Sequence, residues 1–348
     1  MKPRERVIKA LEHEQPDRVP LDIVVRPEVY EKLRRHFGVD KNEPVLKSLG
    51  VDLRSVIMYP PANSELLSLS EYEIFFATAL DEWGVKRRIG ITGEYWHMTY
   101  HPLEHVELDQ YELPDISAPG RFDKAKRQVR EYSEEYFVAG SIPWGLFETA
   151  WALRGFSTFM KDLYTNPRFV NELLDRILEW KTEVGRRFIE LGVDMVAISD
   201  DLGMQTGLML APEMIRRYLI PRYRTMFRDW KKAGVYVFLE SCGNIEKIVP
   251  ELVDTGIDVL DPIQPEVMDP AKLKELYGDK LTFHGTISTQ RTLPFGTVED
   301  VRNEVINRIE KVGYNGGLIL APSNRVISDV PLKNLLTMYE TARSYRSR

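Results

Sequence analysis

The chain has 348 residues, 43% of them hydrophobic and 29% charged, and its formal net charge is −6. This length suits one large α/β domain or two smaller ones, and the composition is that of a globular protein with a sizeable core. The negative charge gives no reason to expect nucleic acid or an anionic membrane as a partner. A single cysteine excludes an internal disulfide, and the charged N-terminus lacks a signal peptide's apolar core. No window approaches about 18 uninterrupted apolar residues, so we expect a cytoplasmic protein.

Short apolar segments alternate with helical patterns along most of the chain. The expected strands are residues 19–25, 53–58, 137–142, 194–199, 235–240, 257–260, 281–283 and 317–320. Helices are expected at residues 3–13, 27–37, 121–133, 146–163, 167–191, 212–233, 270–277, 298–312 and 331–344. Each strand is a nearly continuous apolar run, which is typical of parallel strands buried on both faces.

Residues 74–118 depart from this alternation. Residues 81–86 and 95–100, separated by a stretch with glycines, have the pattern of an antiparallel hairpin. Prolines and a glycine between residues 113 and 120 indicate a connecting segment. We therefore expect a hairpin insertion within a single domain that spans residues 1–348 and begins with a helical extension.

The repeat of strand, loop and helix predicts a (β/α)8 TIM barrel. An open doubly wound sheet fits less well, because no glycine-rich phosphate loop follows any early strand. Polar residues follow the carboxyl ends of the expected strands, which is where barrel enzymes keep their catalytic groups. These ends should meet at one rim.

The expected rim carries acids, bases and arginines. Its members are Arg26, Asp52, Arg54, Trp144, Glu148, Arg154, Asp200, Asp201, Glu240, Cys242, Asp261, His284, Ser323 and Asn324. Arginines suit a carboxylated or otherwise anionic small molecule, and paired carboxylates or a histidine supply acid–base catalysis. We expect Asp200, Asp201 and His284 to be catalytic, although at most one of the two adjacent aspartates should point into the barrel. The expected substrate-binding residues are Arg26, Arg54, Trp144, Glu148, Arg154 and Asn324.

A metal site is a further hypothesis for this rim. The expected strand at residues 235–240 ends in a carboxylate and a thiol, Glu240 and Cys242. With His284 they form a partial zinc set, since Zn²⁺ accepts thiolate, imidazole and carboxylate ligands. His284 can equally be an acid or base, or a structural histidine.

Several motifs resemble those of the uroporphyrinogen decarboxylase superfamily, which includes the decarboxylase itself and zinc-dependent methyltransferases that work with corrinoid proteins. The motifs are P-R-E-R-V-I-K-A-L-E-H-E-Q-P-D-R-V-P (3–20), S-D-D-L-G (199–203), A-P-E-M-I-R-R-Y-L-I-P (211–221), E-S-C-G-N-I (240–245), F-H-G-T-I-S-T-Q (283–290) and G-G-L-I-L-A-P-S-N (316–324). They cover nearly the whole chain, and the (β/α)8 barrel that the resemblance implies agrees with the strand pattern.

Two departures from the family motifs bear on whether the chain is closer to the decarboxylase branch or to the methyltransferase branch of the superfamily. The arginine-rich loop R-Q-A-G-R of the decarboxylases reads V-V-R-P-E-V-Y here and keeps only Arg26, so a porphyrinogen with its many carboxylates is poorly matched. The methyltransferases carry H-x-C and a later cysteine, where this chain has Glu240-Ser241-Cys242 and Ser323. A metal site with this composition has chemically harder ligands, and more oxygen ligands, than the site of the methyltransferases.

The leading hypothesis is a methyltransferase that moves a methyl group from a small methylated or methoxylated substrate to a separate corrinoid protein. Zn²⁺ would be held by Glu240, Cys242 and either His284 or an aspartate. One alternative is a cofactor-free decarboxylase acting on a carboxylated substrate. A second is a non-catalytic protein that binds a corrinoid or a tetrapyrrole. The expected partners are the small molecule and the corrinoid protein. Formation of a homodimer is left open by the sequence.

Overall fold

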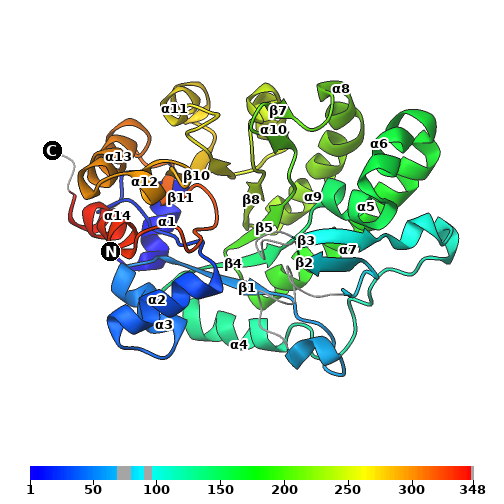
Figure 1. Cartoon of the computed structure of the whole chain (residues 1–348), viewed down its shortest axis with the longest axis horizontal. Coiled ribbons are helices and arrows are strands. Elements are labelled where there is room, and N and C mark those ends of the chain that lie inside the picture. The colour runs from blue at the N-terminus through cyan, green and yellow to red at the C-terminus, as the bar shows by residue number, and fades with distance from the viewer. Residues whose placement is uncertain (69–79, 90–95, 346–348) are drawn as a thin grey trace.

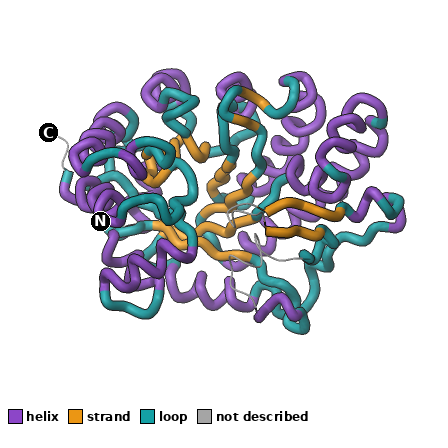
Figure 2. Tube along the Cα trace, viewed as in Figure 1, coloured by secondary structure: helices purple, strands orange, loops and turns teal. Residues whose placement is uncertain are grey.

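The computed structural model describes residues 1–68, 80–89 and 96–345. Seven parallel strands form one curled sheet at the centre of the molecule, and helices lie around it (Figures 1 and 2). In spatial order the strands are β1 (Leu53–Ile57), β4 (Phe137–Ile142), β5 (Met195–Ser199), β8 (Tyr236–Glu240), β9 (Val259–Ile263), β10 (Thr282–Ile287) and β11 (Leu318–Pro322). Spatial order therefore follows chain order, as short crossover connections require.

The segment at residues 19–25 lies between the two edge strands but does not form a strand. The Leu320 amide donates to the Pro20 carbonyl at 2.9 Å, and the Asp52 amide donates to the Leu21 carbonyl at 2.9 Å. Its pairing is limited to two single bridges, from Leu21 to Leu320 of β11 and from Val25 to Val326 beyond that strand. Pro20 has no amide hydrogen to extend the first of them. Of the eight strands expected, the described residues thus form seven.

The helices cover the outer face of the sheet. Their bounds are α1 (Pro3–Leu11), α2 (Pro27–Phe37), α3 (Asn42–Leu49), α4 (Asp123–Tyr132), α5 (Leu146–Arg154), α6 (Phe156–Thr165), α7 (Pro167–Leu191), α8 (Pro212–Met214), α9 (Ile220–Lys232), α10 (Val249–Val253), α11 (Pro270–Tyr277), α12 (Thr292–Phe295), α13 (Val298–Lys311) and α14 (Leu332–Ser344). None of the helices in the described part of the chain combines the length and apolar character that crossing a membrane requires.

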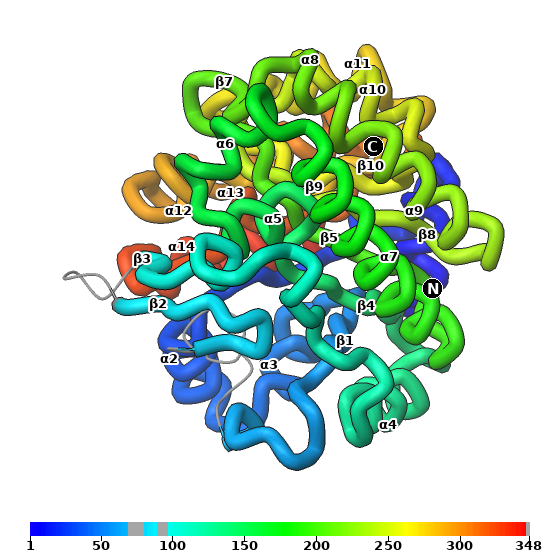
Figure 3. The backbone as a smooth tube through the Cα atoms, turned by 90° about the vertical axis from the view of Figure 1, so that its right-hand side faces the viewer, coloured from blue at the N-terminus to red at the C-terminus, as the bar shows by residue number. Residues whose placement is uncertain are grey.

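Two glycines let the long helix α7 approach its neighbours closely. A Cβ at Gly140 of β4 would lie 2.5 Å from the Phe188 ring of α7, and one at Gly185 of α7 would lie 2.3 Å from Trp230 of α9. Figure 3 shows α7 and α9 running side by side along the outside of the strands. Phe188, Phe227 and Trp230 are buried in this layer, so the sheet and the two helices form one packed core.

The N-terminal helix α1 closes the amino-terminal end of the sheet's interior. Val7 and Leu11 of α1 belong to a buried apolar cluster with residues from six strands. The strand residues of this cluster are Leu53, Phe137, Ala139, Met195, Phe238, Val259 and Ile319. The opposite, carboxyl-terminal end is therefore the end at which the interior can open to solvent.

Two short antiparallel pairs lie outside the main sheet. β2 (Lys86–Ile89) pairs with β3 (Trp96–Tyr100), and β6 (Gly203–Met204) pairs with β7 (Gly207–Leu208). The first pair falls within the expected insertion at residues 74–118, of which residues 74–79 and 90–95 lie outside the described residues.

Candidate functional site

A cavity of about 600 Å³ opens at the carboxyl ends of the strands and extends into the interior of the sheet. Its rim carries most of the polar side chains predicted to meet there. The predicted ones are Trp144, Glu148, Asp201, Glu240, Cys242, Asp261, His284 and Asn324, and Asp22 and Arg325 line the cavity in addition. Cavities of this size bind small molecules rather than macromolecules.

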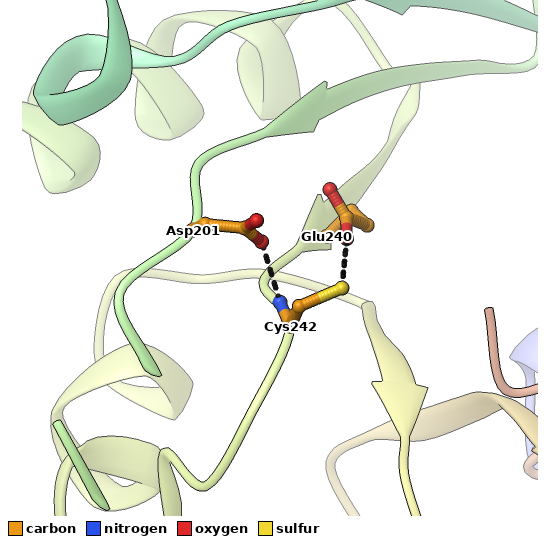
Figure 4. Close-up of side chains that lie close together, drawn as sticks. All are labelled: Asp201, Glu240 and Cys242. Atoms are coloured by element: carbon orange, nitrogen blue, oxygen red, sulfur yellow. Dashed lines mark hydrogen bonds between the residues drawn. The ribbon is translucent and has the colours of Figure 1, made fainter. Parts of the chain in front are cut away.

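Three side chains on one side of the rim form a compact cluster. Asp201 follows β5, Glu240 ends β8 and Cys242 lies two residues beyond it, and each places one potential ligand atom within 4.8 Å of the others (Figure 4). The Cys242 amide donates to Asp201 Oδ1 at 2.8 Å, and the Cys242 thiol donates to Glu240 Oε1 at 3.2 Å. Asn324 Nδ2 approaches the same sulfur at 3.2 Å.

The electrostatics of this cluster favour a bound cation. Burial, and then the neighbouring acids, raise the pKa of Glu240 and of the Cys242 thiol, and burial also raises the pKa of Asp201. Three acidic groups so close together cannot all ionise unless a positive charge joins them. One thiolate and two carboxylates make a ligand set that Zn²⁺ accepts, so these residues fit a zinc ion.

His284 lies on another side of the cavity, held between two carboxylates. Its Nδ1 is 2.5 Å from Asp261 Oδ1, and its Nε2 is 3.1 Å from Asp22 Oδ2. Burial lowers the pKa of this histidine, but Asp261 and Asp22 outweigh that effect and raise it to about 10. Both ring nitrogens are therefore occupied at neutral pH. Of the two alternatives predicted for the third metal ligand, His284 or an aspartate, the one that lies in the cluster is the aspartate Asp201.

The two adjacent aspartates after β5 have different environments. Asp200 is completely buried and accepts hydrogen bonds from the Phe147 and Glu148 amides, at 2.9 and 2.8 Å, and from the Tyr223 hydroxyl at 2.5 Å. It thereby holds the start of α5 and does not line the cavity. Asp200, predicted to be catalytic, therefore lies within a buried hydrogen-bond network, whereas Asp201 faces the cavity.

The three arginines predicted to bind substrate do not reach the cavity with their guanidinium groups. Arg54 pairs with Glu43 of α3 at 2.8 and 2.9 Å, and Arg154 pairs with Asp162 of α6 at 2.8 Å. Arg26 stands directly before α2 and is not among the residues that line the cavity. The phase of a strand or helix decides where a side chain points, and it directs Arg54 and Arg154 toward neighbouring helices.

The structure places Arg325 at the cavity instead, a residue that the sequence analysis missed. Burial raises the pKa of Glu240, and the positive charge of Arg325 partly offsets this rise. The signal in the sequence was its position directly after Asn324 at the end of the last motif. Trp144, Glu148 and Asn324, which were predicted to bind substrate, line the cavity.

The fold and the site together define a class: an α/β protein with TIM-barrel-like architecture and an acidic cavity at the carboxyl ends of its parallel strands. Residues 77–345 match the family described as uroporphyrinogen decarboxylase (URO-D). The match covers well over half of the chain, which therefore belongs to this family.

Relatives of two kinds are similar to the chain. The methylcobamide:CoM methyltransferase MtaA of Methanosarcina barkeri is 23% identical over 359 residues, covering 98% of this chain and 97% of the relative. A uroporphyrinogen decarboxylase of Chlorobium phaeobacteroides is 23% identical over 245 residues, covering 68% of each protein. Among solved structures, a methyltransferase from Methanosarcina mazei superposes with a TM-score of 0.74 at 19% identity, covering 99% of this chain and 98% of that one. That likeness supports the fold.

Proposed function

We propose that the chain is a zinc-dependent methyltransferase that moves a methyl group from a small methylated or methoxylated substrate to the corrinoid of a separate protein. The observation that carries the proposal is the cluster of Asp201, Glu240 and Cys242 above a cavity of small-molecule size. The similarity to MtaA over almost the full length of both chains also favours methyl transfer. Action in the cytoplasm, without membrane or nucleic acid, is part of the proposal.

The cluster residues would hold the metal after losing their protons. Cys242 would bind as a thiolate and Asp201 and Glu240 as carboxylates, since metal ligands must be deprotonated. Bound zinc would supply a Lewis acid for the heteroatom that carries the methyl group. Asn324, at 3.2 Å from the sulfur, would orient the thiolate.

His284 and its two carboxylate partners would donate the proton that the reaction requires. When a methyl group leaves an ether oxygen as a cation equivalent, the oxygen keeps the bonding pair and takes up one proton. The Asp22–His284–Asp261 group borders the cavity and holds a proton on the imidazole at neutral pH. It would therefore serve as the general acid, a role for which the residues must lie within reach of the substrate.

A cofactor-free decarboxylase is the second candidate, because the decarboxylase of Chlorobium phaeobacteroides is also a relative and Arg325 lines the cavity. One arginine could bind one substrate carboxylate. A tetrapyrrole with many carboxylates would need more cationic groups than the described residues place in this cavity.

Metal analysis combined with a methyl-transfer assay tests the proposal. The purified protein should retain close to one zinc per chain, and Cys242→Ala should lose most of it, while Ser328→Ala, on an exposed loop, should keep it. Methylation of an added corrinoid protein should fail after chelation and recover with zinc. A metal-free protein that releases CO₂ from a carboxylated substrate would support the second candidate, and ligand binding without turnover would support a carrier.

A further inference from the structure

Below the acidic cluster, the cavity continues between the strands as an unusually open space, here termed the inner chamber. Its lining side chains are Leu53, Ser55, Ala139, Ser141, Met195, Ala197, Ser199 and Phe238. In parallel barrels these inward positions are normally filled by bulky branched residues that make a solid core. Here three neighbouring strands supply serines and alanines, so the interior stays hollow.

Strand register places these small residues side by side. Ser55 of β1 is opposite Ala139 of β4, and Ser141 of β4 is opposite Ala197 of β5. Since strand side chains alternate between faces, all of them point inward with Ser199. Ser55 is exposed although it lies in the middle of β1, which identifies the surface it faces as the chamber.

The wall and floor of the chamber are uncharged. Leu53, Met195 and Phe238 come from the apolar cluster that α1 closes. Ser55 and Ser141 share a hydrogen bond of 2.7 Å, and the Ser199 hydroxyl accepts a hydrogen bond from the Trp144 amide at 3.2 Å. Hydroxyls of this kind can both donate and accept.

Arg54 shows that charge is kept away from this space. The residue borders the cavity, and its guanidinium donates to Glu43 and to the carbonyls of Val51 and Leu53. A substrate carboxylate placed among the serines and alanines would therefore lose its hydration without a cation from β1, β4 or β5 to pair with it, which is costly. The nearest cationic ring, His284, packs edge-on against Phe238 at 5.2 Å between centroids and is already paired with Asp22 and Asp261. An ether or hydroxyl oxygen could instead bond to the serines.

The chamber lies directly beneath the proposed metal ligands. Ser199 is the register partner of Glu240, and Phe238 is one pleat below Glu240 on the same strand. A molecule standing in the chamber would thus present its upper end to Asp201, Glu240 and Cys242.

We propose that the inner chamber is the specificity pocket of this protein and takes the uncharged, ring-sized part of the substrate, with oxygen substituents bonded to Ser55, Ser141 or Ser199. The orientation of the methyl-bearing atom toward the cluster rests on the proposed methyltransferase function. The chamber's preference for an uncharged ring does not.

Binding of neutral ring probes to the full-length protein tests the inference by calorimetry. The probes are 2-methoxyphenol and 1,2-dimethoxybenzene, compared with 4-methoxybenzoate. The neutral probes should bind the wild type more tightly than the benzoate. Ala197→Leu, which fills the chamber, should weaken their binding about tenfold or more without lowering the melting temperature, since cavity filling is usually tolerated or stabilising.

Two further variants separate this inference from the proposed function. Ala233→Leu makes the same change at an exposed position after α9 and should bind the probes as the wild type does. Cys242→Ala should lose zinc but still bind the probes. The proposal that the chamber binds the substrate's ring would be overturned if both neutral probes failed to bind the wild type. It would also be overturned if Ala197→Leu bound them equally well. If Ala197→Leu loses probe binding while Ala233→Leu and Cys242→Ala keep it, the role of the chamber as a ring-binding pocket is supported, even if neither zinc nor methyl transfer is found.

Discussion

Asp200 and Asp201 are adjacent in the chain, yet their carboxylates do different work. Asp200 serves two amides and the Tyr223 hydroxyl within the core, whereas Asp201 accepts one amide and shares a crowded acidic corner with Glu240. Losing the acceptor for several buried donors is expensive. Removing one of several crowded acids relieves repulsion between like charges.

Alanine substitutions should therefore separate the two residues. Asp200→Ala is expected to lower the free energy of unfolding by about 2–4 kcal/mol, because three buried donors lose their partner. Asp201→Ala should cost clearly less and instead weaken zinc binding. Urea denaturation and zinc titration of both variants give the comparison. Equal destabilisation by the two substitutions would contradict these assignments.

His284 gives the protein a pH-dependent contribution to stability. The pKa of an ordinary histidine is 6.5, whereas in the folded chain Asp261 and Asp22 overcome the effect of burial and raise that of His284 to about 10. A raised pKa stabilises the fold while the group is protonated, so the contribution is complete below about pH 6.5 and is lost as pH rises toward 10.

Denaturant unfolding between pH 6.5 and pH 10 checks this sign. The wild type should lose stability with rising pH by up to about 1.4 kcal/mol per pH unit more than His284→Asn does. His284→Asn serves as the control for the wild type, because it keeps every other titrating group and lacks only the histidine. Parallel stability curves for the two proteins would show that the histidine carries no extra proton in the native state.

At the scale of elements, the contact between α7 and α9 depends on one missing side chain. Gly185 lies where α7 meets Trp230, and a Cβ there would approach that ring to 2.3 Å. In an ordinary helix interior, exchanging glycine for alanine stabilises the protein by roughly 1 kcal/mol. Here the clash should reverse the sign.

Gly185→Ala should therefore destabilise the protein by about 1–3 kcal/mol, as overpacked cores do. Glu179→Ala, at an exposed position of the same helix, should be nearly neutral. Thermal unfolding of both variants measures the difference. A stabilised Gly185→Ala protein would mean that α7 can shift away from α9 at little cost.

For the molecule as a whole, much of the strand framework could be predicted from the sequence. The run at residues 137–142 coincides with β4, and the run at residues 235–240 differs from β8 by one residue. Both are continuous apolar segments ended by polar residues, a local pattern that needs no knowledge of the fold. The segment at residues 19–25 has the same composition, but Pro20 limits its pairing to isolated bridges.

The site was less predictable, because it depends on where side chains point. Arg54 and Ser55 are neighbours on β1, and the alternation along the strand sends the arginine to Glu43 and the serine to the chamber. The sequence alone does not reveal which of the two faces inward. The same uncertainty explains why Asp201, rather than His284, completes the cluster with Glu240 and Cys242.

Zinc should stabilise the entire fold if the cluster joins two strands as proposed. Asp201 follows β5 and Cys242 follows β8, so the three ligands come together only in the folded chain. A ligand that binds only the native state raises the free energy of unfolding by about 2.7 kcal/mol when its free concentration is about 100 times Kd. We expect the metal-free protein to gain several degrees in melting temperature on addition of zinc. Cys242→Ala should show little of this gain, whereas Glu299→Gln, at an exposed acid of α13, should keep it. An equal gain in Cys242→Ala would place the stabilising zinc elsewhere and remove the metal from the proposed mechanism.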